Sequence, residues 1–190
     1  MEKIPTLFDR DWEGNRGVID EPIVDLDFLK ENFLATEKVD GTNIRCTIRG
    51  GECIRLEKRR NPSKEMKQKG IILPWYVEAK EDDPQDKWLF DAVSNSDFLG
   101  VIDGDYSGEA FGPNIQGNPL KVISNRIFLF GCNEVLAQHV CPNVPTNFED
   151  LKNWLQSARS TFNIDCGIEG IVWWNPTTGD RYKIKLKDFK

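Results

Sequence analysis

The most regular alternation of apolar and polar residues begins at Asn43, and it predicts a β-hairpin. Every second residue of the first strand is apolar: Ile44, Cys46 and Ile48. Because successive side chains of a strand point to opposite faces, the polar residues between them share the other face: Asn43, Arg45, Thr47 and Arg49. Gly50-Gly51 predicts a two-residue turn, and Ile54 and Leu56 continue the alternation on the return strand. Asn61-Pro62-Ser63 ends this strand, since proline cannot donate to a ladder.

Helical spacing of apolar residues predicts helices at about residues 24–34, 85–95 and 146–158. Thr146 and Glu149 form a Thr-x-x-Glu capping box at the start of the third. Strands are expected within residues 33–39, 99–111, 122–132, 167–174 and 181–187. Residues 64–86 are charged and punctuated by proline, which predicts a short helix and a surface insertion. Hairpins with segregated helices, rather than alternating βαβ units, indicate an α+β fold.

Composition indicates a folded protein inside the cell. The 190 residues are 39% hydrophobic and include six Trp and eleven Phe, so a sizeable core can form. No apolar run is long enough to cross a bilayer, and Met1 to Asp20 has no signal-peptide core. Five cysteines without a CxxC pair argue against a disulfide framework or a structural zinc site. We expect a soluble, cytoplasmic protein, in the host cytoplasm if it is viral.

The net charge of −6 conceals an uneven distribution. Residues 45–69 carry nine Lys or Arg against three Glu, whereas residues 81–105 are dominated by carboxylates. The basic segment either receives a polyanion or is a solvated hairpin, and charge alone leaves both open. The single histidine, His139, has featureless neighbours and is expected to be a loop or partly buried residue. Any catalysis must then rest on Lys, Asp, Glu and Arg.

One lysine has the setting of a nucleophile. Lys38 lies where a predicted strand runs into the Asp40-Gly41-Thr42 turn. A lysine attacks through its neutral amine, which burial or neighbouring cations favour. The last strand offers such cations, because period-2 geometry places four of its residues on one face: Arg181, Lys183, Lys185 and Lys187. A row of cations fits a triphosphate, although a solvent-facing edge strand protected by lysines has the same pattern.

Six segments, in order, resemble the motifs of covalent nucleotidyltransferases, specifically the ATP-dependent RNA ligases. The segments are Lys38-Val39-Asp40-Gly41, Lys58-Arg59-Arg60, Gly108 to Pro113, Phe128-Leu129-Phe130, Glu169 to Val172 and Lys183 to Lys187. KxDG alone occurs often by chance, whereas the ordered set is specific. The resemblance implies a nucleotidyltransferase, ATP-grasp-like fold of antiparallel sheets flanked by helices.

The resemblance also implies roles for particular residues. Lys38 attacks the α-phosphate, Arg59 contacts ribose or phosphate, Glu109 binds the ribose hydroxyls, Phe130 stacks on the purine, and Glu169 serves a Mg²⁺ or Mn²⁺ ion. Lys185 and Lys187 take the positions of the family's K-x-K pattern. The implied catalytic residues are Lys38, Glu169, Lys185 and Lys187. The implied nucleotide-binding residues are Glu37, Lys38, Asn43, Arg59, Glu109, Phe130, Lys185 and Lys187.

The subtype rests on fewer residues. The segment 108–119, GEAFGPNIQGNP, and the residues IPTLF and PQDKW resemble RNA-repair ligases that act on nicked RNA or cleaved tRNA. In DNA ligases the first motif looks more like KxDGxR, and Arg45 lies two residues too late to match its arginine. The alternatives are a DNA ligase, a capping guanylyltransferase that uses GTP, and a non-catalytic RNA-binding module.

The same resemblance sets an expectation for the organisation of the chain. We expect a monomeric adenylyltransferase domain over residues 1–190, with an N-terminal segment over 1–34 and the motif-bearing core over 35–187. Only Asp188-Phe189-Lys190 follow the last motif, so no second domain is expected after it. The chain is then either a minimal ligase or a shortened one.

Overall fold

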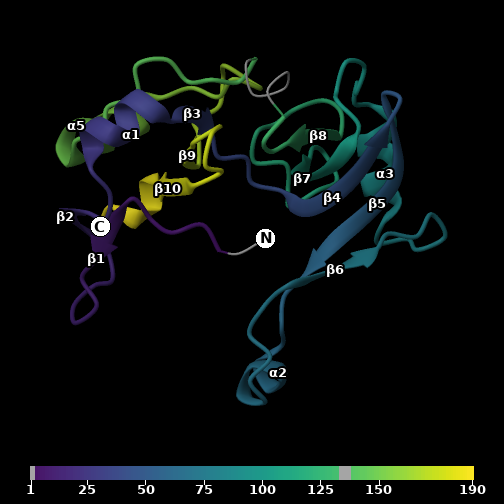
Figure 1. Ribbon diagram of the computed structural model, residues 1–190, viewed down its shortest axis with the longest axis horizontal. Helices are drawn as coiled ribbons and strands as arrows, with labels where there is room; N and C mark the ends of the chain where they lie inside the picture. Colours follow the sequence, from purple (N-terminus) through teal and green to yellow (C-terminus); the bar gives the residue numbers. More distant parts are fainter. Residues whose placement is uncertain (1–2, 133–137) are drawn as a thin grey trace. The chain divides into compact units, whose positions relative to one another are not determined.

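The computed structural model describes residues 3–132 and 138–190, which divide into two compact units (Figure 1). One unit holds Lys3 and residues 40–132, and the other holds residues 4–39 and 138–190. Each unit is built on antiparallel sheet with few helices, so the predicted α+β class is confirmed. Across the described ranges, no helix is both long and apolar enough to cross a membrane.

The unit over residues 40–132 contains a five-stranded antiparallel sheet in the order β6-β5-β4-β7-β8. Its strands are β4 (Thr42–Arg49), β5 (Glu52–Arg60), β6 (Trp75–Glu78), β7 (Gly104–Phe111) and β8 (Arg126–Leu129). The helix α3 (Lys87–Ser94) packs against β7 and β8, with Leu89 and Ala92 buried. A second, short helix, α2 (Lys64–Gln68), lies between β5 and β6. One face of the sheet therefore carries a core, and the other is free for polar side chains.

The predicted hairpin is present, with one correction on its return strand. Ile44, Cys46 and Ile48 are completely buried, as the alternation predicts, and Leu56 is buried as well. Ile54, however, is 61% exposed. The ladder pairs Thr47 with Arg55 but Ile48 with Cys53, so Ile54 is the extra residue of a β-bulge. A bulge shifts the phase of a strand, and a strictly alternating pattern cannot anticipate it.

The insertion over residues 64–86 contains more regular structure than its composition predicts. The expected short helix is α2, but Trp75–Glu78 also forms a strand, β6, which pairs with β5. The aromatic and β-branched residues of β6 favour a strand. The charged, proline-containing flanks hid that signal in the sequence.

The unit over residues 4–39 and 138–190 contains a three-stranded sheet in the order β10-β9-β3 and a two-stranded sheet, β1-β2. Its strands are β1 (Phe8–Arg10), β2 (Val18–Pro22), β3 (Leu34–Glu37), β9 (Gly170–Trp174) and β10 (Arg181–Lys185). Its helices are α1 (Leu26–Asn32), α5 (Phe148–Ser157) and the 3-10 turn η1 (Leu186–Asp188). Buried apolar residues of the sheet and both helices form one core, including Leu29, Ile171 and Ile184.

Helix starts in this unit depend on single capping side chains. Asp25 caps α1 by accepting a hydrogen bond from the Phe28 amide at 2.7 Å. The cap of α5 is Asn147, whose side chain accepts from the Asp150 amide at 2.9 Å. The predicted capping box at Thr146 is therefore wrong by one residue. Asn and Thr are both good caps, and the sequence pattern alone favoured the Thr-x-x-Glu spacing.

Two isoleucines of the same hairpin give a direct test of the bulge. Ile44→Ala should lower the free energy of unfolding by about 2–5 kcal/mol, because it leaves a cavity in the core. Ile54→Ala should change it by less than about 0.5 kcal/mol, because that side chain is already in solvent. Urea denaturation followed by circular dichroism measures both. Equal losses in the two variants would show that Ile54 is buried and that the strand has no bulge.

Candidate active site

The three-stranded sheet brings three of the predicted catalytic residues to one of its ends. Lys38 directly follows β3, Glu169 directly precedes β9, and Lys185 ends β10. β9 is antiparallel to both neighbours, so the end of β3, the start of β9 and the end of β10 coincide. The Lys38 amide continues the ladder by donating to the Gly170 carbonyl at 2.8 Å. Residues far apart in sequence are thus adjacent through backbone pairing alone.

Glycine is required where this ladder passes Gly170. A Cβ at this position would lie 2.0 Å from the Ile184 carbonyl oxygen, on the neighbouring strand. Any other residue would push β9 and β10 apart beside Glu169 and Lys185. The Glu-Gly sequence recognised in the motif therefore has a physical cause.

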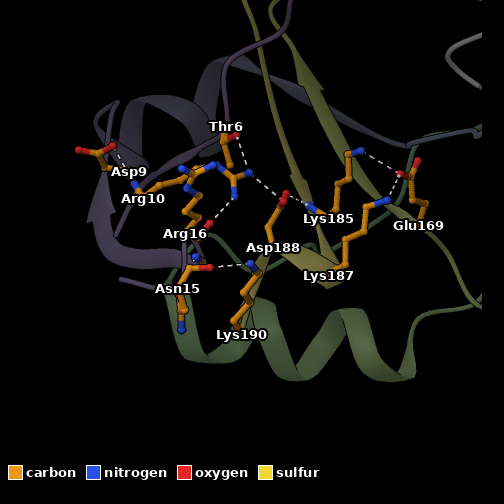
Figure 2. A network of polar contacts seen from close by, with 11 residues as sticks. Thr6, Asp9, Arg10, Asn15, Arg16, Glu169, Lys185, Lys187, Asp188 and Lys190 are labelled. Carbon is orange, nitrogen blue, oxygen red and sulfur yellow. Dashed lines mark hydrogen bonds and ion pairs between the residues drawn. The ribbon is translucent and has the colours of Figure 1, made fainter. Parts of the chain in front are cut away.

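The side chains of these residues converge on the carboxylate of Glu169. Lys38 Nζ donates to Glu169 Oε2, and Lys185 Nζ lies 3.0 Å from Glu169 Oε1. Lys187 Nζ lies 3.8 Å from the same oxygen but remains 72% exposed. Figure 2 shows both Lys185 and Lys187 pointing to this carboxylate. Burial by itself raises the pKa of Glu169, but the bonds and charges of Lys38 and Lys185 outweigh it and lower that pKa below its ordinary value.

The geometry changes the expected relation between Lys38 and the other cations. The sequence predicted cations beside the amine, whereas a carboxylate lies between Lys38 and Lys185. Lys187 also lies outside the strand, since β10 ends at Lys185 and η1 follows. The predicted alternation over Arg181, Lys183, Lys185 and Lys187 therefore fails at its last member. Lys187 reaches Glu169 because the chain turns there.

A buried aspartate holds this turn. Asp188 Oδ2 accepts a hydrogen bond from the Lys185 amide at 3.0 Å, and Asp188 Oδ1 pairs with Arg10 at 2.7 Å (Figure 2). Arg10 also donates to Thr6 Oγ1 at 3.3 Å and to the Arg16 carbonyl at 2.9 Å. The sequence did not predict the Arg10–Asp188 ion pair, because the two residues are 178 positions apart and no local pattern connects them. Together they fix the backbone that carries Lys185 and Lys187.

Glu37, predicted to bind the nucleotide, is only 1% exposed. Its Oε2 accepts three hydrogen bonds, from Ser160 Oγ, the Thr161 amide and Thr161 Oγ1, while its Oε1 is buried and has no partner within residues 3–132 and 138–190. Burial raises the pKa of Glu37, and the Ser160 and Thr161 bonds offset part of that rise. One carboxylate oxygen is thus saturated, and the other has unused accepting capacity.

His139 has the partly buried position expected of it. Its ring stacks on Phe162 with centroids 4.2 Å apart, and its Nδ1 lies 3.2 Å from Thr161 Oγ1. Burial lowers the pKa of His139, which favours the neutral ring. His139 therefore contacts the same Thr161 hydroxyl that donates a hydrogen bond to Glu37. Nothing in its sequence neighbours indicated this contact.

The other predicted nucleotide-binding residues lie in the unit over residues 40–132, on the sheet face opposite its core. Asn43 of β4 is paired with Glu109 of β7, and Asn43 Nδ2 lies 3.3 Å from Glu109 Oε2. Glu109 Oε1 accepts from the Gly41 amide at 3.2 Å. A Cβ on Gly41 would lie 2.1 Å from the Ala110 carbonyl oxygen, which explains glycine in the KxDG motif. The structure thus brings together two residues, Asn43 and Glu109, that the resemblance assigns to nucleotide binding.

Arg59 lies in the same row of the sheet. It is paired with Tyr76 of β6, whose hydroxyl donates to Asn43 Oδ1 at 2.9 Å. Arg59 Nε is buried and has no hydrogen-bond partner among the described residues. A buried, unpaired guanidinium nitrogen is costly unless a ligand satisfies it. Tyr76 was not predicted, because the strand that carries it was not.

Phe130 follows β8 and is more accessible than Phe128 for stacking against an aromatic ring of a ligand. Phe128 is only 2% exposed, whereas Phe130 is half-buried. The Phe130 amide donates to the Ser107 carbonyl at 2.7 Å, and the two rings meet edge to face at 5.8 Å. An accessible ring with a fixed backbone suits stacking.

The protein supplies no complete metal cage in the part of the chain that the structure describes: no group of three or more His, Cys, Asp or Glu side chains gathers there. Glu169 is a lone carboxylate among cations. Mg²⁺ characteristically binds one or two carboxylates together with substrate phosphates and water. The donor set therefore fits a metal that arrives with a nucleotide.

No protein-family model matches this chain, and no curated protein matches it significantly. Among solved structures, it is similar to an RNA ligase of Naegleria gruberi with AMP and manganese, at 15% identity and a TM-score of 0.48, over 85% of this chain and 52% of that one. The same ligase with ATP and manganese gives 14% identity and a TM-score of 0.47, over 95% of this chain and 59% of that one. The chain spans little more than half the length of these structures.

The Arg10–Asp188 pair can be tested through stability. Asp188→Ala removes a buried ion pair and the acceptor of the Lys185 amide, so the free energy of unfolding should fall by about 1–3 kcal/mol. Lys190→Ala removes only an exposed contact to the Asn15 carbonyl and should change it by less than about 0.5 kcal/mol. Denaturant midpoints measure both variants. A midpoint of Asp188→Ala equal to that of Lys190→Ala would show that the turn is held by other contacts.

Proposed function

We propose that this chain is an ATP-dependent RNA ligase that works through a lysyl-adenylate. The observation that carries the proposal is the convergence of Lys38, Lys185 and Lys187 on Glu169. An amine nucleophile, two further cations and one carboxylate at the end of one sheet suit transfer of a phosphoryl group. The ordered motifs of the sequence support the same class.

In the first step, Lys38 is the nucleophile. Its neutral nitrogen bonds to the α-phosphorus of ATP, the bond from that phosphorus to the bridging oxygen breaks, pyrophosphate leaves, and the nitrogen releases a proton. Lys185 and Lys187 bind and orient the phosphates, where negative charge accumulates. Lys38 Nζ is held by its contact with Glu169, so that contact must separate before the nitrogen attacks.

Glu169 also holds the divalent cation. A bound Mg²⁺ or Mn²⁺ neutralises phosphate charge, which is the chemistry it supplies in phosphoryl transfer. Glu169, the nucleotide phosphates and water are its ligands in this proposal. The lowered pKa of Glu169 keeps its carboxylate charged at neutral pH, as a metal ligand must be.

The remaining residues bind the nucleoside. Glu109 and Asn43 offer a carboxylate and an amide to the ribose hydroxyls, and Arg59 offers its unpaired Nε to ribose or phosphate. Phe130 stacks on the purine, and Glu37 Oε1 accepts a hydrogen bond from the nucleotide. These assignments use the unsatisfied or half-buried groups of each unit.

Two further transfers complete the reaction. The adenylyl group moves from Lys38 to an RNA 5′-phosphate, and a 3′-hydroxyl then attacks that phosphate and displaces AMP. Both are in-line phosphoryl transfers, in which positioning and charge neutralisation supply most of the rate. The RNA is nicked or broken and includes cleaved tRNA in this proposal. We propose that the monomer acts as an adenylyltransferase domain.

The test of the nucleophile is covalent labelling. The protein with Mg²⁺ and α-labelled ATP should form an adduct that is stable in alkali and labile in acid, as a phosphoramidate is. Lys38→Ala should abolish the label, because the attacking nitrogen is gone, whereas Lys30→Ala, which removes an exposed lysine of α1, should label normally. Gel autoradiography measures all three. Full labelling of Lys38→Ala would refute the assignment, and labelling by GTP instead of ATP would indicate a capping enzyme.

The second test addresses the groups around the phosphate. Glu169→Ala and Lys185→Ala should keep the fold but slow self-adenylylation by about 10²-fold or more, because each acts on charge that develops in the transition state. Single-turnover labelling gives the rate, and circular dichroism checks the fold. A loss of less than about threefold in a folded variant contradicts the role given to that residue. Joining of nicked DNA but not nicked RNA by the wild type would indicate a DNA ligase.

A further inference from the structure

The connection between β5 and β6, residues 61–74, forms an arm that extends from the sheet of its unit (Figure 1). Ser63 caps α2 by accepting from the Met66 amide at 3.2 Å, and α2 has no buried residue. Gly70 has a φ of +83° and reverses the chain, so that the Ile71 amide bonds back to the Met66 carbonyl at 3.0 Å. The arm is therefore ordered by its own hydrogen bonds and contributes no side chain of α2 to the core.

The returning limb of the arm exposes consecutive aliphatic side chains. Ile71, Ile72 and Leu73 are 47%, 68% and 63% exposed, and Trp75 at the base of the arm is 37% exposed. Single exposed apolar residues are ordinary, but a contiguous run is unfavourable in water unless something covers it. These residues stabilise no part of the described core, since neither core cluster contains them. Their exposure indicates a docking surface.

Cations of the basic segment 45–69 separate into two groups in the structure. Three of the six on the strands are in ion pairs: Arg45 with Glu57, Arg55 with Glu57 and Glu78, and Lys58 with Asp83 and Asp86. The other three, Arg49, Arg59 and Arg60, have no ion pair in the part of the chain that the structure describes. Those on the arm are Lys64, Lys67 and Lys69, which are exposed and have no ion-pair partner in the described ranges. Glu65 is the only acidic residue of the arm. The arm thus offers a partner three exposed lysines and a single opposing carboxylate.

We propose that this arm is a docking surface for double-helical RNA beside the ends to be joined, an inference that rests on the proposed function. Lys64 and Lys67 lie three residues apart on one helix, hence on one face, and suit neighbouring phosphates of a strand. The minor groove of an RNA helix is wide and shallow, and proteins that bind the minor groove of DNA combine basic residues with apolar wedges. Ile72 and Leu73 form the wedge, and the lysines hold the backbone.

The arm should act only in the steps that use RNA. The proposed ATP-binding groups of its unit are Asn43, Arg59 and Glu109 on the sheet and Phe130 directly after β8, and none lies within residues 61–74. Self-adenylylation should therefore be unchanged by substitutions in the arm. RNA affinity and its salt dependence should change, and the two kinds of arm residue should change them differently.

The experiment measures binding of the full chain to a fluorescent nicked RNA duplex by anisotropy at several salt concentrations. The double variant Lys64→Ser with Lys67→Ser should weaken binding and reduce the slope of log K against log salt by about one per lost contact. The double variant Ile72→Ser with Leu73→Ser should weaken binding by about tenfold with an unchanged slope, because it loses apolar contact and no charge. All four side chains are exposed, so the fold should be kept.

Matched controls lie elsewhere on the same unit. Leu99→Ser and Ile123→Ser remove aliphatic side chains that are 84% and 94% exposed, and Lys80→Ser removes an exposed lysine. These variants should bind RNA as the wild type does. Equal losses in the controls would show a general effect of surface composition and would overturn the proposal.

Three other outcomes also overturn it. The first is RNA binding by both double variants at wild-type affinity and slope, or no RNA binding by the wild type. The second is that the wild type binds phosphatidylserine vesicles and the two double variants do not, while the variants bind RNA as the wild type does. A membrane would then be the occupant of the arm. The third is a wild-type dimer in gel filtration that Ile72→Ser with Leu73→Ser converts to monomer. Failure of the proposed function is distinguishable, because it appears as absent ATP labelling in a wild type whose arm still binds RNA.

Discussion

The antiparallel pairing of β3, β9 and β10 is the constraint on which the candidate active site depends. It places the residue after β3, the residue before β9 and the last residue of β10 at one end of the sheet, although these are separated by up to 147 positions, from Lys38 to Lys185. The carboxylate of Glu169 then binds both amines. Without that carboxylate, three lysine side chains would repel one another at a partly buried place, so the same residue holds the cluster together and gives it chemistry.

The second set of predicted residues follows a different construction principle. The unit over residues 40–132 keeps its core cluster on one face of the sheet and leaves Asn43, Arg59 and Glu109 in a row across the other, where Phe128 pairs with Glu109. Tyr76 reaches Asn43 from the edge strand and extends that row. Ladder hydrogen bonds set the spacing of such a row, so polar groups are held in place without being buried in a core.

What the sequence predicts here is what local patterns encode. Period-2 alternation predicted the hairpin and the burial of Ile44, and the position of Lys38 followed from a strand running into a turn signal. The failures have non-local or finely balanced causes. Arg10 and Asp188 meet only after the sheets have formed, β6 depends on β5 as a partner, and the cap of α5 moved one residue between two good capping types. Asn43 and Glu109 are in contact because β4 pairs with β7, and local sequence patterns do not show which strands pair.

The bulge at Ile54 decides which of three consecutive basic residues faces Asn43. Lys58, Arg59 and Arg60 are adjacent basic residues, and the phase of β5 decides which face of the sheet each one occupies. With the extra residue in the strand, Lys58 turns to the core side and is neutralised by Asp86, while Arg59 comes to the polar face beside Asn43. In an uninterrupted ladder, Lys58 would take the place of Arg59, and the charged pair Arg55 and Glu57 would point into the apolar core. One inserted backbone unit thus selects a planar guanidinium over an ammonium at this position, which is a choice between forked and point-like recognition of an anion.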